Sequence, residues 1–343
     1  MCSILPSIPD LSSSLTKYLF NVKCIVFWRC IFCFHTQGSN GIKYHKRLNV
    51  VVFIMKNNGS SFAVIGGDKR QLYCARSLCD DGYVVSLGGF DSISSMNNIE
   101  ITSPFEAALM SEIIILPLPC VNADGFIPAP FAKESIALSD ELISAIKGKR
   151  IFCGMKDRLL KHRPELSPYV SDYYEREEFA VCNAGATAEG ALSIAIKNFE
   201  GTICGAKVLV CGYGRIGKAL LSMLSAMGAD VTVSARKASD LAWIELTGAK
   251  AVRTDMLYKE DGFDIIFNTI PHRILTCVLL AKIATRAVVI DLASGEGGVD
   301  KYAAQRLGIT NIHALSLPGR YSPKTAGEIV KKTIYHILEE DDR

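Results

Sequence analysis

The stretch from Lys207 to Arg236 constrains the fold more than any other part of this chain, because it combines a strand, a glycine turn, a helix and a second strand. It opens with a short apolar, β-branched run that is typical of a buried parallel strand. Gly212, Gly214 and Gly217 follow in the spacing G-x-G-x-x-G. In this spacing the first glycine allows a tight turn, the second lets the backbone approach a pyrophosphate, and the third lets the helix pack close to the strand.

This unit predicts a Rossmann domain that binds a nicotinamide dinucleotide at the N-terminus of its first helix, where free N–H groups attract phosphate. The end of the second strand bears on cofactor choice, since an NAD site usually carries Asp or Glu there for the ribose 2′-OH. Ser234, Arg236 and Lys237 stand there instead, and their polar and cationic groups could bind a 2′-phosphate. NADP is therefore expected, with NAD as the alternative. The predicted cofactor contacts in this unit are Gly212, Tyr213, Gly214, Arg215, Ile216, Gly217, Ser234, Arg236 and Lys237.

Composition and charge exclude several classes of protein. The chain has 343 residues, enough for two domains and a site between elements of each. A formal net charge of +3 and the lack of a dense basic stripe argue against nucleic-acid binding. The 12 cysteines are scattered, which fits small buried side chains in a reducing cytosol better than a disulfide framework. Cys30 and Cys33 make a C-x-x-C pair, but nothing completes a zinc site, so no metal is expected.

Residues 1–55 differ in character from the rest of the chain. The segment from Tyr18 to Phe34 is apolar and aromatic, but it contains Lys23 and Arg29 and is short for a membrane-spanning helix. No small-residue cleavage site follows it, so a signal peptide is not indicated. We interpret residues 1–55 as a non-native or leader extension, with translation starting at Met55; a membrane-associated leader is the alternative.

Alternating strand and helix patterns predict an α/β fold with two doubly wound parallel-sheet domains, the second a Rossmann NAD(P)-binding fold. Residues 56–185 are predicted to form a smaller, irregular substrate domain in which Phe179 to Cys182 is a short last strand. A helix from Asn183 to about Phe199 leads into a six-stranded Rossmann domain at 186–316. Residues 317–343 end the chain with a proline-initiated helix that is expected to pack back on the first domain.

In open α/β sheets, ligands bind beyond the carboxyl ends of the strands. In the cofactor domain this rule selects the turns after the fourth and fifth strands and the segment Leu317 to Gly319. In the first domain it selects Gly66 to Arg70, Pro117 to Pro119 and Lys156, with Asn183 to Glu189 at the join. The further predicted cofactor contacts are Asn268, Thr269, Ile270, Pro271, Asp291, Leu292 and Ala293.

These segments together resemble the A subunits of dipicolinate synthase from spore-forming bacteria. The matching motifs are A-V-I-G-G-D-x-R-Q (Ala63 to Gln71), N-x-x-x-T-x-E-G (Asn183 to Gly190), G-x-G-R-x-G-x-A (Gly212 to Ala219), G-A-x-V-x-V-x-A-R (Gly228 to Arg236), N-T-I-P (Asn268 to Pro271), D-L-A-S with a following G-G-x-D (Asp291 to Asp300), and L-P-G followed by P-K-T-A-G (Leu317 to Gly327). The resemblance runs from about Phe62 to Glu339 and leaves the segment before Met55 without a counterpart.

The resemblance implies an enzyme that oxidises dihydrodipicolinate to dipicolinate (pyridine-2,6-dicarboxylate) with NADP, in the cytoplasm of the mother cell during sporulation. It also implies a partner, a flavoprotein-like B subunit, and an oligomer is expected. Aromatisation requires hydride removal toward the nicotinamide and loss of a ring proton, while the protein supplies orientation and electrostatics. Whether the substrate is the dihydro compound or its hydrated precursor stays open.

A small dicarboxylate substrate requires cations, which are best supplied as a bidentate arginine. Arg70, Lys156, Arg320 and Lys324 are candidates by their positions along the chain. Arg70 and Lys324 rank first because they lie inside the matched motifs.

The proton acceptor is expected to be a carboxylate, and the matched motifs offer Asp68 and Glu189. His272 ranks lower, because the motif before it ends at Pro271. Two alternative functions remain: another two-domain dehydrogenase of the hydroxyacid or alanine type, or a cofactor-binding partner protein without catalysis. The hydroxyacid enzymes need an Arg and a Glu–His pair, for which the six histidines offer no convincing match.

Overall fold

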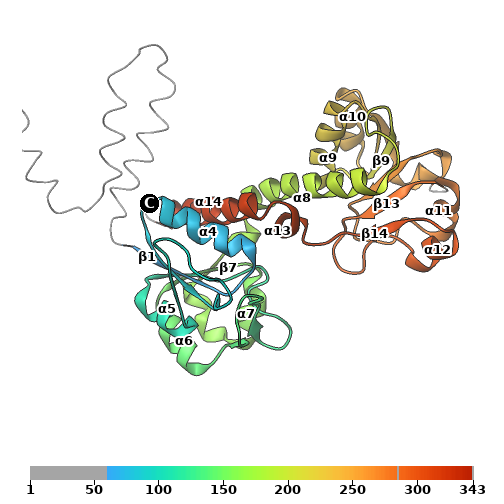
Figure 1. Ribbon diagram of the computed structural model, residues 1–343. Helices are drawn as coiled ribbons and strands as arrows, with labels where there is room; N and C mark the ends of the chain where they lie inside the picture. The colour runs from blue at the N-terminus through green and yellow to red at the C-terminus, as the bar shows by residue number, and fades with distance from the viewer. Residues whose placement is uncertain (1–59, 284–285, 342–343) are drawn as a thin grey trace, which may run out of the picture. The chain divides into compact units, whose positions relative to one another are not determined.

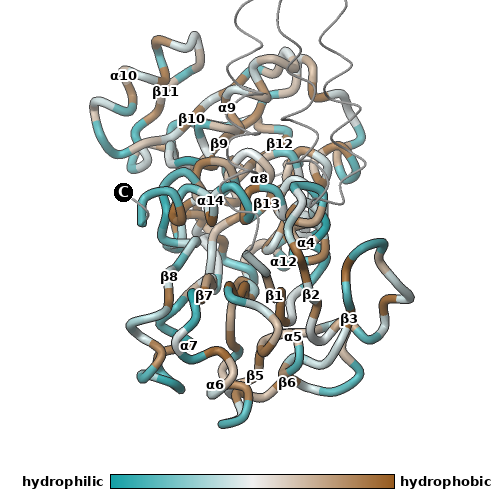
Figure 2. Tube along the Cα trace, turned by 90° about the vertical axis from the view of Figure 1, so that its left-hand side faces the viewer, coloured by the Kyte–Doolittle hydropathy of each residue, from teal (hydrophilic) through white to brown (hydrophobic). Residues whose placement is uncertain are grey.

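The computed structural model describes residues 60–283 and 286–341, so the predictions for residues 1–55 lie outside the described residues. Within them the chain forms two six-stranded parallel sheets with helices packed against each (Figure 1). The strands follow hydrophobic segments of the chain (Figure 2). The predicted fold class, with two doubly wound α/β domains, is confirmed.

The first sheet has the strand order β3-β2-β1-β4-β7-β8, and every neighbouring pair is parallel. Its strands are β1 (Ser61–Ile65), β2 (Val84–Gly88), β3 (Glu100–Thr102), β4 (Ile113–Ile115), β7 (Arg150–Cys153) and β8 (Val170–Asp172). The connecting elements are α4 (Lys69–Asp80), α5 (Pro104–Met110), β5 (Phe126–Ile127), β6 (Ile136–Ala137), α6 (Asp140–Ile146), α7 (Lys156–His162), η2 (Pro164–Tyr169) and η3 (Tyr173–Glu175). The central strands are buried on both faces, as their apolar sequences require.

The second sheet has the order β11-β10-β9-β12-β13-β14, again with all pairs parallel. Its strands are β9 (Lys207–Cys211), β10 (Asp230–Ala235), β11 (Lys250–Arg253), β12 (Ile265–Asn268), β13 (Val288–Asp291) and β14 (Asn311–His313). The connecting elements are α9 (Arg215–Ala226), α10 (Ala238–Leu246), η4 (Thr254–Lys259), α11 (Cys277–Ile283) and α12 (Lys301–Arg306). In both sheets the order reverses beside the first strand, which creates the switch point where ligands of open α/β sheets bind.

Two expectations for the first half are wrong. Its sheet is not smaller or irregular: it has as many strands as the second and the same order, because β3 and β8 add to the predicted ones. Both are three-residue strands, too short to show a periodic pattern in the sequence. Phe179 to Cys182 is not a strand but part of helix α8 (Glu177–Asn198). A short apolar run cannot be told from a buried helical segment by periodicity alone.

Helix α8 continues through residues 185 and 186, so the expected domain boundary falls inside one unbroken helix. Of the helices in the described part of the chain, α8 is long and apolar enough to span a membrane by composition. However, 56% of its most apolar window is buried inside the fold, as in a core helix. It packs against α9 and against the short helix α13 (Leu317–Tyr321).

The last helix, α14 (Pro323–Asp341), lies along α4 (Figure 1). The two backbones approach closely at Gly327, where a Cβ atom would lie 2.5 Å from the carbonyl oxygen of Arg70. Further along, the largely buried Lys331 Nζ pairs with Asp81 Oδ2 at 2.7 Å, and the Tyr335 hydroxyl donates to the same oxygen at 2.8 Å. Burial of this polar cluster ties the C-terminal helix to the first sheet's own helix layer.

Candidate dinucleotide and substrate site

The glycine turn after β9 is built for close backbone approach. Gly212 has φ +101°, and a Cβ there would lie 2.5 Å from Thr269 Oγ1. A Cβ on Gly217 would lie 2.1 Å from the Gly212 carbonyl oxygen, so the start of α9 rests directly on the turn. Gly214 caps α9 without any side-chain hydrogen bond, and a Cβ there would meet no atom within 4 Å. The uncapped helix start therefore faces open space, which fits a pyrophosphate.

The side chains within this turn differ in how free they are. Tyr213 is half-buried, with Lys218 Nζ 5.3 Å from the centre of its ring. The exposed Arg215 donates from Nε to Glu177 Oε1 on α8 at 2.9 Å. This hydrogen bond lowers the pKa of the Glu177 carboxyl below its ordinary value. Arg215 is thus engaged by a protein carboxylate, whereas the backbone of the turn is free.

The residues at the end of β10 divide into one buried side chain and two exposed cations. Ser234 has no exposed surface, because it lies within the strand between β9 and β11. Arg236 and Lys237 are exposed, and neither makes a hydrogen bond or ion pair with any residue that the structure describes. No carboxylate follows β10 before Asp240, so a 2′-phosphate would meet cations here.

The ends of β12 and β13 are joined by a buried hydrogen-bond network. Asn268 Nδ2 donates to Asp291 Oδ1 at 2.8 Å and to the Ile270 carbonyl at 3.0 Å. Asp291 also accepts the backbone N–H of Ala293 at 3.2 Å and that of Gly298 at 2.9 Å. Asn268 and Asp291 thus hold both turns in place from below.

The remaining predicted contacts of these turns are spread between the core and the rim. Thr269 Oγ1 donates to the carbonyl of Cys211 at 2.8 Å, which links its turn to the start of the glycine turn. Pro271 is exposed, Ile270 is half-buried, and Leu292 is buried. These turns follow strands adjacent to β9, so they flank the same carboxyl edge.

On the first sheet, Asp68 and Arg70 form one unit at the start of α4. Asp68 is the N-cap: its side chain accepts the Arg70 backbone N–H, while its own N–H donates to Gln71 Oε1 in a capping box. Arg70 Nε donates to Asp68 Oδ1 at 2.9 Å, and Arg70 Nη2 donates to the Leu118 carbonyl at 2.9 Å. The turn before α4 requires glycine, because Gly67 has φ +97°.

The Arg70 guanidinium keeps one edge without a protein partner. Its side chain is only 16% exposed, and the contacts to Asp68 and Leu118 use the Nε side of the group. The Nη1 group makes no hydrogen bond with the described residues, so the Nη1–Nη2 edge is available. This is an edge that binds a carboxylate through two parallel hydrogen bonds.

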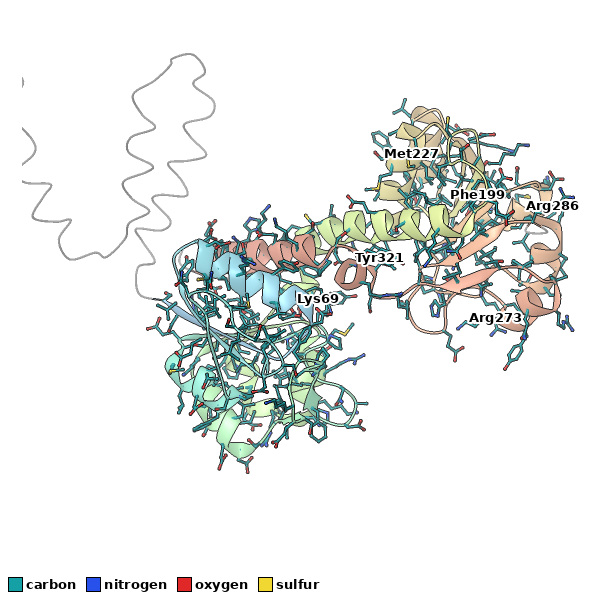
Figure 3. All side chains as sticks on the ribbon, viewed as in Figure 1. Lys69, Phe199, Met227, Arg273, Arg286 and Tyr321 are labelled. Carbon is teal, nitrogen blue, oxygen red and sulfur yellow. The ribbon has the colours of Figure 1, made fainter. Side chains whose placement is uncertain are left out.

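Helix α13 joins this unit to α8. A Cβ on Gly319 would lie 3.1 Å from both Arg70 Nε and Asp68 Oδ2, so the helix backbone rests against the pair. A Cβ on Gly190 would lie 2.9 Å from Leu317 Cβ, at the start of the same helix. Figure 3 labels Tyr321 at the end of α13 and Lys69 beside the Asp68–Arg70 pair. Segments far apart in sequence therefore meet around α13.

The other predicted cations and bases are less engaged. Glu189 is exposed on α8, next to Gly190. Lys324 is exposed at the start of α14 and makes no ion pair with the described residues. Arg320 is exposed and lies 5.7 Å from the ring centre of Tyr321, and His272 is exposed after β12. None of these four makes a contact that would fix its role.

Lys156 is occupied by a neighbour that the sequence analysis did not consider. Its Nζ pairs with Glu175 Oε2 at 2.7 Å, which raises the pKa of the ammonium group. Its backbone N–H donates to Asp172 Oδ2 at 2.8 Å, and Asp172 also accepts the N–H groups of Met155 and Tyr174. Asp172 thereby shapes the turn after β7, but a single aspartate in a variable segment gave no sequence signal for this.

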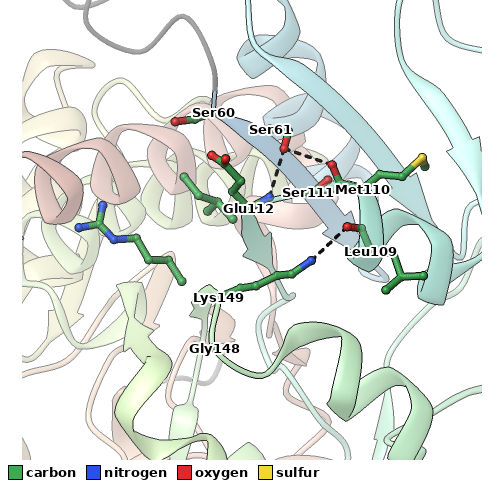
Figure 4. A pocket seen from close by; sticks show the side chains of 10 residues that line it. Ser60, Ser61, Leu109, Met110, Ser111, Glu112, Gly148 and Lys149 are labelled. Carbon is green, nitrogen blue, oxygen red and sulfur yellow. Dashed lines mark hydrogen bonds between the residues drawn. The ribbon is translucent and has the colours of Figure 1, made fainter.

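A cavity of about 590 Å³ lies at the opposite, amino edge of the first sheet (Figure 4). Residues at the starts of β1, β4 and β7 line it, including Ser61, Glu112 and Lys149. It contains none of the predicted site residues. Because ligands of open α/β sheets bind at the carboxyl edge, we do not assign the substrate to this cavity.

Two family models match this chain. The N-terminal domain of the dipicolinate synthase A subunit matches residues 61–165, and the NAD-binding domain of D-isomer-specific 2-hydroxyacid dehydrogenases matches residues 187–307. The A subunit of dipicolinate synthase from Bacillus subtilis strain 168 is 32% identical over 287 residues, which span 82% of this chain and 97% of the relative. This chain belongs to the family of dipicolinate synthase A subunits.

Solved structures of dipicolinate synthase A subunits support the same assignment. The crystal structure from Bacillus halodurans has a TM-score of 0.75 at 32% identity and covers 82% of this chain and 98% of its own. The corresponding structure from Bacillus subtilis has a TM-score of 0.73 at 32% identity, with coverages of 82% and 96%. The resemblance to this family is therefore confirmed, and the second half is an NAD-binding domain of the dehydrogenase type.

Proposed function

We propose that this protein is the A subunit of a dipicolinate synthase that oxidises dihydrodipicolinate to dipicolinate with NADP as the acceptor. The observation that carries the proposal is the Arg70 guanidinium, held by Asp68 and the Leu118 carbonyl with its Nη1–Nη2 edge free. A planar guanidinium fixed from one side selects a carboxylate on the other. Family membership supplies the reaction, since the curated relative carries the name of this synthase.

The cofactor would be held by the turn at Gly212 to Gly217, whose backbone and helix start fit a pyrophosphate. Arg236 and Lys237, exposed after β10, would bind a 2′-phosphate; the buried Ser234 is left out of this role. When bound, the nicotinamide supplies a hydride acceptor. Arg70 orients the substrate by one carboxylate, and the exposed Lys324 is the candidate for the other.

For the proton, we propose Glu189 as the acceptor and Asp68 as a positioning residue. The Asp68 oxygens already accept N–H groups from the backbone and the side chain of Arg70. Glu189 is exposed and makes no hydrogen bond with the residues described, so both its oxygens are available. The flavoprotein-like B subunit is the proposed partner, in the cytoplasm of a sporulating mother cell.

An assay of the purified chain with dihydrodipicolinate and NADP⁺, with and without the B subunit, tests this function. Equal amounts of dipicolinate and NADPH are expected from the complex. Turnover only with the partner would place part of the chemistry outside this chain. Saturable binding of the dinucleotide without turnover under either condition would favour the cofactor-binding, non-catalytic alternative.

Arg70→Lys is expected to lower kcat/KM for dihydrodipicolinate about a hundredfold, because a point charge replaces a bidentate donor whose hydrogen bonds are charge-assisted. NADP⁺ affinity should stay unchanged, since Arg70 lies on the first sheet's side of the site. Steady-state kinetics and calorimetric titration measure the two effects. Arg76→Lys, an exposed change on the same helix, is the matched control; an equal loss in both variants would contradict the assignment.

Arg236→Asp is expected to reverse the cofactor preference from NADP to NAD. The carboxylate would repel a 2′-phosphate and accept a hydrogen bond from a ribose 2′-OH. Because Arg236 is exposed, thermal stability should not change. Titration of the variant with both dinucleotides measures the ratio of dissociation constants, and an unaltered ratio would remove Arg236 from the site.

A further inference from the structure

Asp291, the last residue of β13, is a buried negative charge without a cation. It has no exposed surface, and no Lys, Arg or His among the described residues lies within ion-pair distance of it. Its partners are the Asn268 amide and the backbone N–H groups of Ala293 and Gly298. All three are donors, so a proton on the carboxyl group would have no acceptor, and the group is ionised.

Backbone, not solvent, closes around this carboxylate. A Cβ on Gly297 would lie 2.1 Å from Asp291 Oδ2, and a Cβ on Gly298 would lie 2.4 Å from Asn268 Nδ2. Only glycine fits at either position. A buried charge that keeps hydrogen bonds but lacks a counter-charge is costly, and such groups are retained where a charged ligand supplies the compensation.

The position of Asp291 relative to the dinucleotide follows from strand order. The pyrophosphate site lies at the start of α9, and the adenosine ribose is assigned to the end of β10 by Arg236. In the order β10-β9-β12-β13, β12 and β13 lie on the other side of that site. The second mononucleotide, which carries the nicotinamide, therefore extends over the carboxyl ends of β12 and β13, where Asp291 ends its strand.

We propose that Asp291 sets the redox preference of the cofactor site by favouring the oxidised dinucleotide. This inference rests on the proposed NADP-dependent oxidation. The nicotinamide ring is cationic in NADP⁺ and neutral in NADPH, so a nearby fixed negative charge attracts only the oxidised form. The site is thereby kept loaded with the acceptor and releases the reduced product readily, which suits a protein that works in the direction of oxidation.

The test compares the affinities of NADP⁺ and NADPH for the full chain by calorimetric titration. In Asp291→Asn the ratio of the dissociation constant of NADP⁺ to that of NADPH is expected to rise about tenfold or more, because a buried charge near the ring is removed. The matched control is Asp264→Asn. Asp264 accepts the Lys207 N–H at 2.8 Å at the amino edge of the same sheet, so the ratio should not change.

His313→Lys gives an independent route if Asp291→Asn does not fold, because the introduced amide could not accept all three donors. His313 Nε2 lies 3.0 Å from the Ala293 carbonyl oxygen and beside the same loop. A cation there would neutralise the charge of Asp291 and raise the ratio in the same direction, whereas His313→Gln would not. Parallel changes in both affinities would overturn the inference; failure of the unmodified chain to bind either form would instead overturn the proposed function.

Discussion

Gly217→Ala is expected to lower the free energy of unfolding by about 3 kcal/mol, since overpacking of this severity reaches the top of the usual range. The added Cβ would lie 2.1 Å from the Gly212 carbonyl oxygen and 3.0 Å from its carbon. Both are backbone atoms of the turn that joins β9 to α9, so neither can swing aside as a flexible side chain would. Urea unfolding measures the loss, and dinucleotide binding should fall with it as the helix start is displaced.

Gly214→Ala is the matched control within the same motif. A Cβ there meets no atom within 4 Å, and the backbone has a φ of −81°, which alanine adopts freely. This variant should keep the stability of the unmodified chain but lose affinity for NADP⁺, because the methyl group occupies the space assigned to the pyrophosphate. A stable Gly217→Ala variant, or a Gly214→Ala variant with full affinity, would contradict the geometry of this turn.

Gly327→Ala is expected to destabilise the protein by a similar amount, about 3 kcal/mol, through the contact between α14 and α4. Its Cβ would lie 2.5 Å from the Arg70 carbonyl oxygen and 2.7 Å from the Cys74 amide nitrogen. Pushing the helices apart also strains the buried pair of Lys331 and Asp81. Kinetics should show a further loss, because Arg70 lies at the point of contact.

Gly185→Ala controls for the general effect of alanine in a helix. Gly185 lies within α8 with no atom within 4 Å of an added Cβ. Removing a glycine from a helix interior stabilises it by up to about 1 kcal/mol. The two substitutions should therefore shift the midpoint of urea unfolding in opposite directions; a shift of the same sign would contradict the close approach at Gly327.

The cofactor half was predictable in detail because its signals are local. A buried strand, three glycines at fixed spacing and an amphipathic helix together define one βαβ unit, and the unit determines where phosphate binds. The cationic end of β10 could be read directly for the same reason. For the first half, three-residue strands and an apolar run at Phe179 carry too little pattern to separate strand from helix, which is why β8 and the start of α8 were missed.

The sequence by itself determined two doubly wound sheets, a dinucleotide turn at Gly212 to Gly217, and a set of polar residues at strand ends. It could not rank those residues, because their roles depend on partners distant along the chain. Tertiary structure alone showed that Arg70 is held by Asp68 and the Leu118 carbonyl, that Glu175 occupies Lys156, and that Asp291 is buried without a cation. Hydrogen bonds and ion pairs act over a few ångströms in space, so their assignment waits until folding brings distant segments together.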